Sequence, residues 1–218
     1  MFNEPLWKRA FPPFFLPAIY YFLPALAQDI DPQAPIEFLQ QEFLAPSSSA
    51  ARIVDILAQV KLKNQQPYLV LVHVEIQGYN DPTFAQRMFS YFCRIKEKYP
   101  THNIVALALF TDDNPHYHPT QYHYAFYGTE VLYKYNTFKL LSKKVEELYV
   151  EGNPFSLVLQ VARVALERRR KGLERWKLAW LKRLIQEFRK QAWELEQVRV
   201  FLYFVVESIK GMQLENQQ

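Results

Sequence analysis

The chain has 218 residues, of which 50% are hydrophobic and 22% are charged, and its formal net charge is +4. This length and composition suit one α/β domain with a helical appendage, and the mild positive charge permits nucleic-acid binding. The single cysteine, Cys93, excludes an intrachain disulfide and predicts a reducing, cytoplasmic compartment. No run of 18 uninterrupted apolar residues occurs, which argues against a membrane-spanning helix.

The N-terminal segment, residues 5–26, is apolar and aromatic. Within it, Lys8 and Arg9 precede an apolar run, residues 10–26, as in a secretion signal, but four prolines interrupt that run. Large aromatic side chains follow helical spacing within it: Trp7, Phe11, Phe14 and Phe15. The alternatives are a membrane-surface helix and a proline-interrupted helix packed on a sheet, and we expect the second.

Three runs that follow predict strands. Residues 36–43 can form a short strand or half a helix, and we expect the strand because the run is short and lies between prolines. Residues 53–62 and 68–77 are rich in β-branched and aliphatic side chains and flank the polar segment 63–67. These two runs therefore predict an antiparallel hairpin.

The register of this hairpin brings two acids together. Centring the turn on Gln65 places Asp55 opposite Glu75, with Cβ atoms about 4.5–5.5 Å apart. Because side chains alternate along a strand, His73, Glu75 and Gln77 share one face. Facing carboxylates are unfavourable unless they share a proton or bind a hard divalent cation. A slip of one residue in the register would remove the pair.

A helix is predicted from Asp81-Pro82 to Pro100, because Asp is a good N-cap and Pro suits the first helical position. Its apolar stripe is expected to contain Phe84, Met88, Phe92 and Ile95, and Cys93 is expected to be buried. A second stripe contains Arg87, Tyr91 and Arg94.

The chain beyond residue 100 is predicted to form strands first and then helices. Residues 104–110 are continuously apolar, which predicts a strand buried on both faces. Residues 122–135 predict a strand pair around Gly128. Helical periodicity follows in three segments: residues 155–170, 173–193 and 194–209.

The helical region is basic. Residues 163–190 contain eleven Arg or Lys residues and three Glu residues. Such an excess suits contact with a phosphate backbone, although a solvated helix face is an equally good interpretation. The candidate DNA-binding residues are Arg168, Arg169, Arg170, Lys171 and Arg175.

Several stretches resemble a known family. The predicted order of helix, three strands, helix and strand, with an acid on the second strand and E-x-Q on the third, resembles the PD-(D/E)XK nuclease superfamily. The stretches EFLQQEF, RIVDILAQVKL, VLVHVEIQG, DPTFAQRMFSYFCRI and EGNPFSLVLQVARVAL resemble its Rpn-like branch, the recombination-promoting nucleases or putative transposases. The resemblance covers nearly the whole chain. It implies an α/β restriction-endonuclease-like core in residues 1–140 and a basic α-helical region in residues 141–218.

The resemblance also implies a metal site. Asp55 and Glu75 would bind Mg²⁺ or Mn²⁺, with Glu42 as an auxiliary ligand. Gln77 stands where the superfamily usually has Lys, and it would orient water or phosphate by hydrogen bonds. Because Gln carries no charge, Arg87 is the candidate for a substitute cation.

The implied function is a metal-dependent DNA endonuclease linked to transposition or recombination. The alternative is a non-catalytic DNA-binding or assembly protein that retains the nuclease fold and self-associates through its helical tail. The expected partner in both cases is DNA and not a membrane.

Overall fold

The computed structural model describes residues 4–39, 55–63, 69–167, 173–190 and 193–214. The chain forms two compact units. One contains Gln28–Phe110 and His116–Phe138, and the other contains Met1–Ala27, Thr111–Pro115 and Lys139–Gln218. The first 27 residues therefore group with the C-terminal helices, whereas the predicted division at residue 140 placed them with the core.

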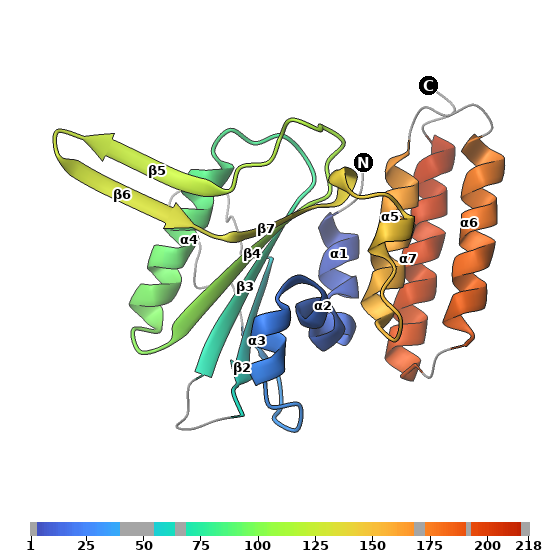
Figure 1. The fold of residues 1–218 in the computed structure, drawn as a ribbon, viewed down its shortest axis with the longest axis horizontal. Helices are drawn as coiled ribbons and strands as arrows, with labels where there is room; N and C mark the ends of the chain where they lie inside the picture. Colours follow the sequence, from blue (N-terminus) through green and yellow to red (C-terminus); the bar gives the residue numbers. More distant parts are fainter. Residues whose placement is uncertain (1–3, 40–54, 64–68, 168–172, 191–192, 215–218) are drawn as a thin grey trace. The chain divides into compact units, whose positions relative to one another are not determined.

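A five-stranded mixed sheet organises the first unit (Figure 1). The strand order is β1-β2-β3-β4-β7, where β1 and β2 pair antiparallel, β2 and β3 pair antiparallel, and β3 and β4 pair parallel. The strands are β1 (Glu37–Phe38), β2 (Ile56–Lys61), β3 (Leu69–Gln77), β4 (Asn103–Phe110) and β7 (Asn136–Lys139). Parallel strands need a crossover connection, and helix α4 (Phe84–Lys98) supplies it. The predicted α/β class is confirmed.

The interior of the sheet follows the predicted apolar runs. Most of β3 is buried, and β4 is buried from Ala106 to Phe110, as expected of strands covered on both faces. The predicted strand at residues 36–43 is present as the two-residue β1, and residues 40–43 lie outside the described part of the chain.

Helix α4 departs from its prediction in two ways. It begins at Phe84, because residues 82 and 83 form a turn that the Asp81 side chain caps. Its buried stripe contains Tyr91, and Phe92 is half-buried against Tyr133, with ring centroids 4.9 Å apart. Cys93 is exposed, so the predicted burial of its thiol is wrong.

The predicted strand pair around Gly128 is confirmed. Strands β5 (Gln121–Phe126) and β6 (Thr129–Lys134) form a separate two-stranded sheet (Figure 1). Its two turn residues, Tyr127 and Gly128, have φ angles of 45° and 83°. Two successive positive φ angles are those of a type I′ turn, which matches the twist of a hairpin and favours glycine.

The second unit is helical. Its elements are α1 (Glu4–Ala10), the 3₁₀ turn η1 (Pro12–Phe14), α2 (Phe15–Phe22), the 3₁₀ turns η3 (Leu140–Ser142) and η4 (Glu146–Leu148), α5 (Pro154–Leu166), α6 (Leu173–Phe188) and α7 (Leu195–Leu214). Helix α3 (Pro24–Asp29) begins in this unit and its last two residues belong to the first unit. The last three helices match the predicted segments within a few residues. Among the described helices, none has both the length and the apolar character needed to span a membrane.

The aromatic N-terminal segment packs on these C-terminal helices. The ring of Trp7 lies 5.2 Å from that of Phe204 on α7, and the ring of Phe11 lies 5.4 Å from that of Phe155 on α5. The predicted proline-interrupted helical segment is confirmed. Its aromatic side chains were predicted to pack on the sheet, but they pack on α5 and α7. Helix α5 suits this role because it is buried along almost all of its length.

Candidate functional site

The predicted register of the β2–β3 hairpin is confirmed. Ile56 pairs with Val74 and Leu57 pairs with His73. One further step along the same register places Asp55, the residue before β2, opposite Glu75 on β3. Both acids are buried, with exposed fractions of 6% for Asp55 and 4% for Glu75.

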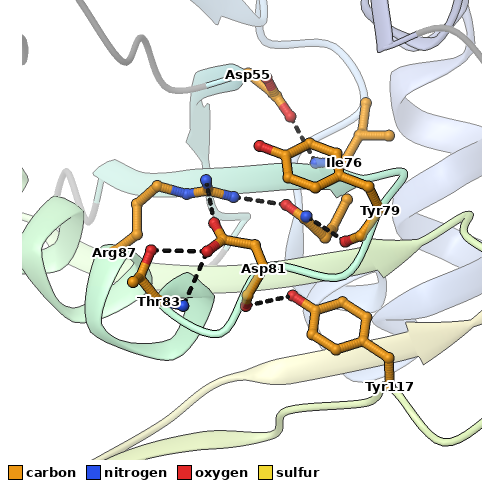
Figure 2. A network of polar contacts seen from close by, with 8 residues as sticks. Asp55, Ile76, Tyr79, Asp81, Thr83, Arg87 and Tyr117 are labelled. Atoms are coloured by element: carbon orange, nitrogen blue, oxygen red, sulfur yellow. Dashed lines mark hydrogen bonds and ion pairs between the residues drawn. The ribbon is translucent and has the colours of Figure 1, made fainter.

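Each of the two carboxylates accepts a main-chain hydrogen bond from the opposite side of the strand pair. The N–H of Ile76 donates to Oδ2 of Asp55 at 2.6 Å, as Figure 2 shows. The N–H of Asp55 donates to Oε1 of Glu75 at 3.1 Å. Each carboxylate is thereby anchored across the strand pair.

His73 contacts the same carboxylate. Its Nε2 lies 3.0 Å from Oε1 of Glu75, and the residue is fully buried. The His73 ring also meets the ring of Tyr91 edge to face, with centroids 5.6 Å apart. Its second nitrogen, Nδ1, has no hydrogen-bond partner among the residues that the structure describes. With its proton on Nε2, His73 donates to Glu75 and limits the movement of that carboxylate.

Gln77, two residues beyond Glu75, belongs to a second network. Its Oε1 accepts from Nη2 of Arg87 at 2.6 Å, and its Nε2 donates to the carbonyl of Tyr79 at 2.5 Å. Because arginine only donates and a carbonyl oxygen only accepts, these partners determine which way the amide faces. Both ends of the Gln77 amide therefore bind protein groups.

Arg87 and Asp81 complete this network (Figure 2). Nη1 of Arg87 donates to Oδ2 of Asp81 at 2.8 Å. Oδ1 of Asp81 accepts from both the N–H and the hydroxyl of Thr83, at 2.8 Å and 2.7 Å. The side chains of this ion pair are 13% exposed for Arg87 and 11% for Asp81.

The surrounding charges keep Arg87 protonated. Burial alone would lower its pKa, but the negative charges of Glu75 and Asp81 and a hydrogen bond with Tyr79 outweigh burial and raise the pKa. The positive charge of Arg87 thus lies close enough to Glu75 for the two side chains to interact electrostatically.

The donor chemistry of the acid pair fits a hard cation. Asp55 and Glu75 supply carboxylate oxygens, which Mg²⁺ and Mn²⁺ prefer. Within the described ranges, no group of three or more His, Cys, Asp and Glu residues is arranged to hold a metal. Glu42, the predicted third ligand, lies outside the described residues.

Comparisons with known proteins do not assign a family. No protein-family model, no curated protein and no solved structure matches this chain. The nuclease resemblance in the sequence is therefore a prediction, and the site geometry is the physical basis for a functional proposal.

The structure brings together three of the predicted site residues on β3 and α4: Glu75, Gln77 and Arg87, with Asp55 across the strand pair. Arg175 lies exposed on α6, and the other predicted DNA-binding residues, 168–171, lie outside the described ranges. Sequence reasoning missed Asp81 as a partner of Arg87. It interpreted Asp81 as a helix cap, and the spacing of six residues is not a helical pairing distance.

Proposed function

We propose that this chain is a metal-dependent DNA endonuclease with a PD-(D/E)XK-type core, linked to transposition or recombination as the Rpn-like resemblance implies. The observation that carries the proposal is the anchored acid pair. Asp55 and Glu75 face each other in register, and each carboxylate is oriented by main-chain N–H groups. An acid pair that is held in place at the end of a strand is suited to bind a catalytic divalent cation through its carboxylate oxygens.

The residues have separate roles in this mechanism. Asp55 and Glu75 would hold Mg²⁺ or Mn²⁺, with Glu42 as an auxiliary ligand. When bound, the ion would polarise the phosphodiester and lower the pKa of an attacking water. Arg87 keeps a positive charge beside Glu75 and is suited to a phosphate oxygen. Gln77 acts through Arg87, because both ends of its amide bind protein groups.

DNA would be held by the basic helical region. Arg175 is exposed on α6 and is suited to a phosphate contact. Phosphate contacts give affinity without sequence information, so this region would position the duplex and the acid pair would cut it.

The test is nicking of supercoiled plasmid in Mg²⁺ or Mn²⁺. Asp55→Asn keeps the size of the side chain and an oxygen for the Ile76 N–H, but it removes the charge that binds metal. We expect it to lower the cleavage rate by at least about 100-fold. Mutating a residue that only hydrogen-bonds to a metal ligand already lowers activity by up to about 100-fold, and Asp55 would be a ligand itself. Asp113→Asn, at an exposed acid, is the matched control and should cut like the wild type. Undiminished cleavage by Asp55→Asn would sink this site.

A second function is favoured by one observation. Both acids are almost fully buried and already accept main-chain hydrogen bonds. Two acids that only stabilise the fold would show the same burial and the same hydrogen bonds. A non-catalytic DNA-binding or assembly protein would show salt-sensitive DNA binding, with log K falling by about 0.9 per phosphate contact per log unit of salt. It would show no cleavage in the same samples with either metal. Sedimentation of the full chain would show whether it also self-associates.

A further inference from the structure

Arg87 is held from two sides by groups that come from different parts of the chain. Asp81 lies in the loop before α4 and Gln77 lies at the end of β3. We propose that Asp81 and Gln77 are positioning residues that hold the Arg87 guanidinium as the fixed cation of the candidate site. The functional part of this inference rests on the proposed nuclease activity, and the holding of the guanidinium does not.

Asp81 is itself fixed before it meets Arg87. Oδ1 of Asp81 accepts two hydrogen bonds from Thr83, and the carbonyl of Asp81 accepts from the hydroxyl of Tyr117 at 3.0 Å. Hydrogen bonds therefore fix both the side chain and the main chain of Asp81 (Figure 2). The second carboxylate oxygen, Oδ2, is left directed at Nη1 of Arg87.

The main chain of Arg87 is fixed as well. Its N–H donates to the carbonyl of Thr83 at 2.9 Å, which places it in the first turn of α4. Its guanidinium carbon lies 5.1 Å from the centre of the Phe84 ring, within reach of a cation–π contact. The helix start and the ring therefore limit the rotamers that the side chain can adopt.

Gln77 holds the opposite side of the guanidinium. It sits two residues beyond Glu75 on the same strand face, so its bond to Nη2 connects α4 to the strand that carries the acid. The planar fork of arginine can donate to both an amide oxygen and a carboxylate at once, which the single ammonium of lysine cannot do with the same geometry. Arg87 thus supplies the charge that Gln77 lacks.

The geometry has a functional consequence. A cation that stabilises a phosphoryl transition state is effective only when its position does not have to reorganise during the reaction. The bonds from Asp81 and Gln77 remove that reorganisation. Loss of one of them should leave the charge in place but free the guanidinium to move.

The first measurement follows the guanidinium directly. In the ¹⁵N-labelled full chain, rotation about Cζ–Nη averages the Nη signals of a free arginine, and a held guanidinium gives separate signals. We expect separate Arg87 signals in the wild type and merged signals in Asp81→Asn, with an otherwise native spectrum. Asp113→Asn should leave them separate. Separate Arg87 signals in Asp81→Asn would overturn the inference, whatever the chain does to DNA.

The second measurement is the rate of metal-dependent nicking. Asp81→Asn should lower kcat by about 100-fold, the loss expected from a misplacement of about 1 Å, while KM for the plasmid stays unchanged. Arg87→Lys keeps the positive charge but removes the planar guanidinium, and it should lower kcat by a similar factor. The double variant Asp81→Asn/Arg87→Lys should lower kcat little more than either single variant does. Merged Arg87 signals with an unchanged kcat would overturn the positioning role. A wild type that nicks no plasmid would overturn the proposed function alone, and the spectra would still decide whether Asp81 holds Arg87.

Discussion

Asp55 accepts a hydrogen bond from the main-chain N–H of Ile76, next to Glu75, and Glu75 accepts one from the main-chain N–H of Asp55. This exchange explains how two acids can face each other inside a protein. Hydrogen bonds to charged groups are each worth about 1.5–3 kcal/mol, which offsets part of the repulsion and of the lost hydration. A divalent cation bound by the two carboxylates would reduce their repulsion further.

The first prediction concerns metal-dependent stability. A cation that binds the folded acid pair stabilises the fold by about 2.7 kcal/mol when its concentration is 100 times the dissociation constant. We therefore expect Mn²⁺ to raise the thermal unfolding midpoint of the wild type and to leave that of Asp55→Asn unchanged. Asp113→Asn should respond like the wild type. An equal rise in Asp55→Asn would place the metal elsewhere.

The second prediction uses two tyrosines that differ in one hydrogen bond. The buried hydroxyl of Tyr133 has no partner among the described residues, whereas that of Tyr135 donates to the carbonyl of Pro119 at 3.1 Å. Tyr135→Phe should lower the free energy of unfolding by about 1 kcal/mol, and Tyr133→Phe should leave it unchanged or raise it. Urea denaturation of both variants at pH 7 measures the difference. Equal losses in the two variants would contradict the contrast in their hydroxyl environments.

The third prediction is the alkaline limit of stability. Burial raises the pKa of both tyrosines, and for Tyr135 the neighbouring Tyr117 and Tyr133 add to the effect. Their unfolded pKa is about 10, so the unfolded chain loses these protons first as the pH rises. Stability from this source is complete below pH of about 10 and falls above it, by at most about 1.4 kcal/mol per pH unit for each group.

Unfolding by urea between pH 8 and pH 11 tests this fall. The variant Tyr133→Phe/Tyr135→Phe should lose less stability over that range than the wild type. Tyr127→Phe, at a side chain that is 94% exposed, should follow the wild type. A fall that is the same in all three proteins would show that other groups cause it.

The features that sequence predicted well are local. The predicted hairpin centre at residue 65 gives the pairing that β2 and β3 show, and this pairing brings Asp55 opposite Glu75. Gly128 marks a turn that needs positive φ angles. In both cases a few adjacent residues determine the geometry, so no knowledge of distant contacts was required.

The features that sequence missed depend on contacts between elements. Phe92 and Tyr91 are adjacent aromatic residues on α4, and the spacing of Phe84, Met88, Tyr91 and Ile95 is as helical as the predicted stripe. Which one is buried depends on what covers it: Tyr91 packs in a cluster with Leu57, Leu71 and Ile95. The bond from Arg87 to Gln77 likewise joins two elements, and periodicity within one element cannot reveal it.

The last prediction concerns the buried ion pair in the helical unit. Nζ of Lys139 lies 2.6 Å from Oδ1 of Asp112, and both side chains are at most 3% exposed. Oδ2 of Asp112 has no partner within the described part of the chain. Because burying an unpaired charge is costly, Lys139→Met should lower the free energy of unfolding by about 3–5 kcal/mol.

Removing both charges separates the value of the pair from the cost of an orphaned charge. In Lys139→Met/Asp112→Asn, the amide can still accept from the N–H of Asn114, and no net charge remains buried. We expect the double variant to recover most of the stability that the single variant loses, since replaced ion pairs are often neutral in energy. Lys134→Met, at an exposed lysine, should change the stability by no more than about 0.5 kcal/mol. A double variant as unstable as Lys139→Met would show that the lost packing of the lysine stem, and not the unpaired carboxylate, causes the damage.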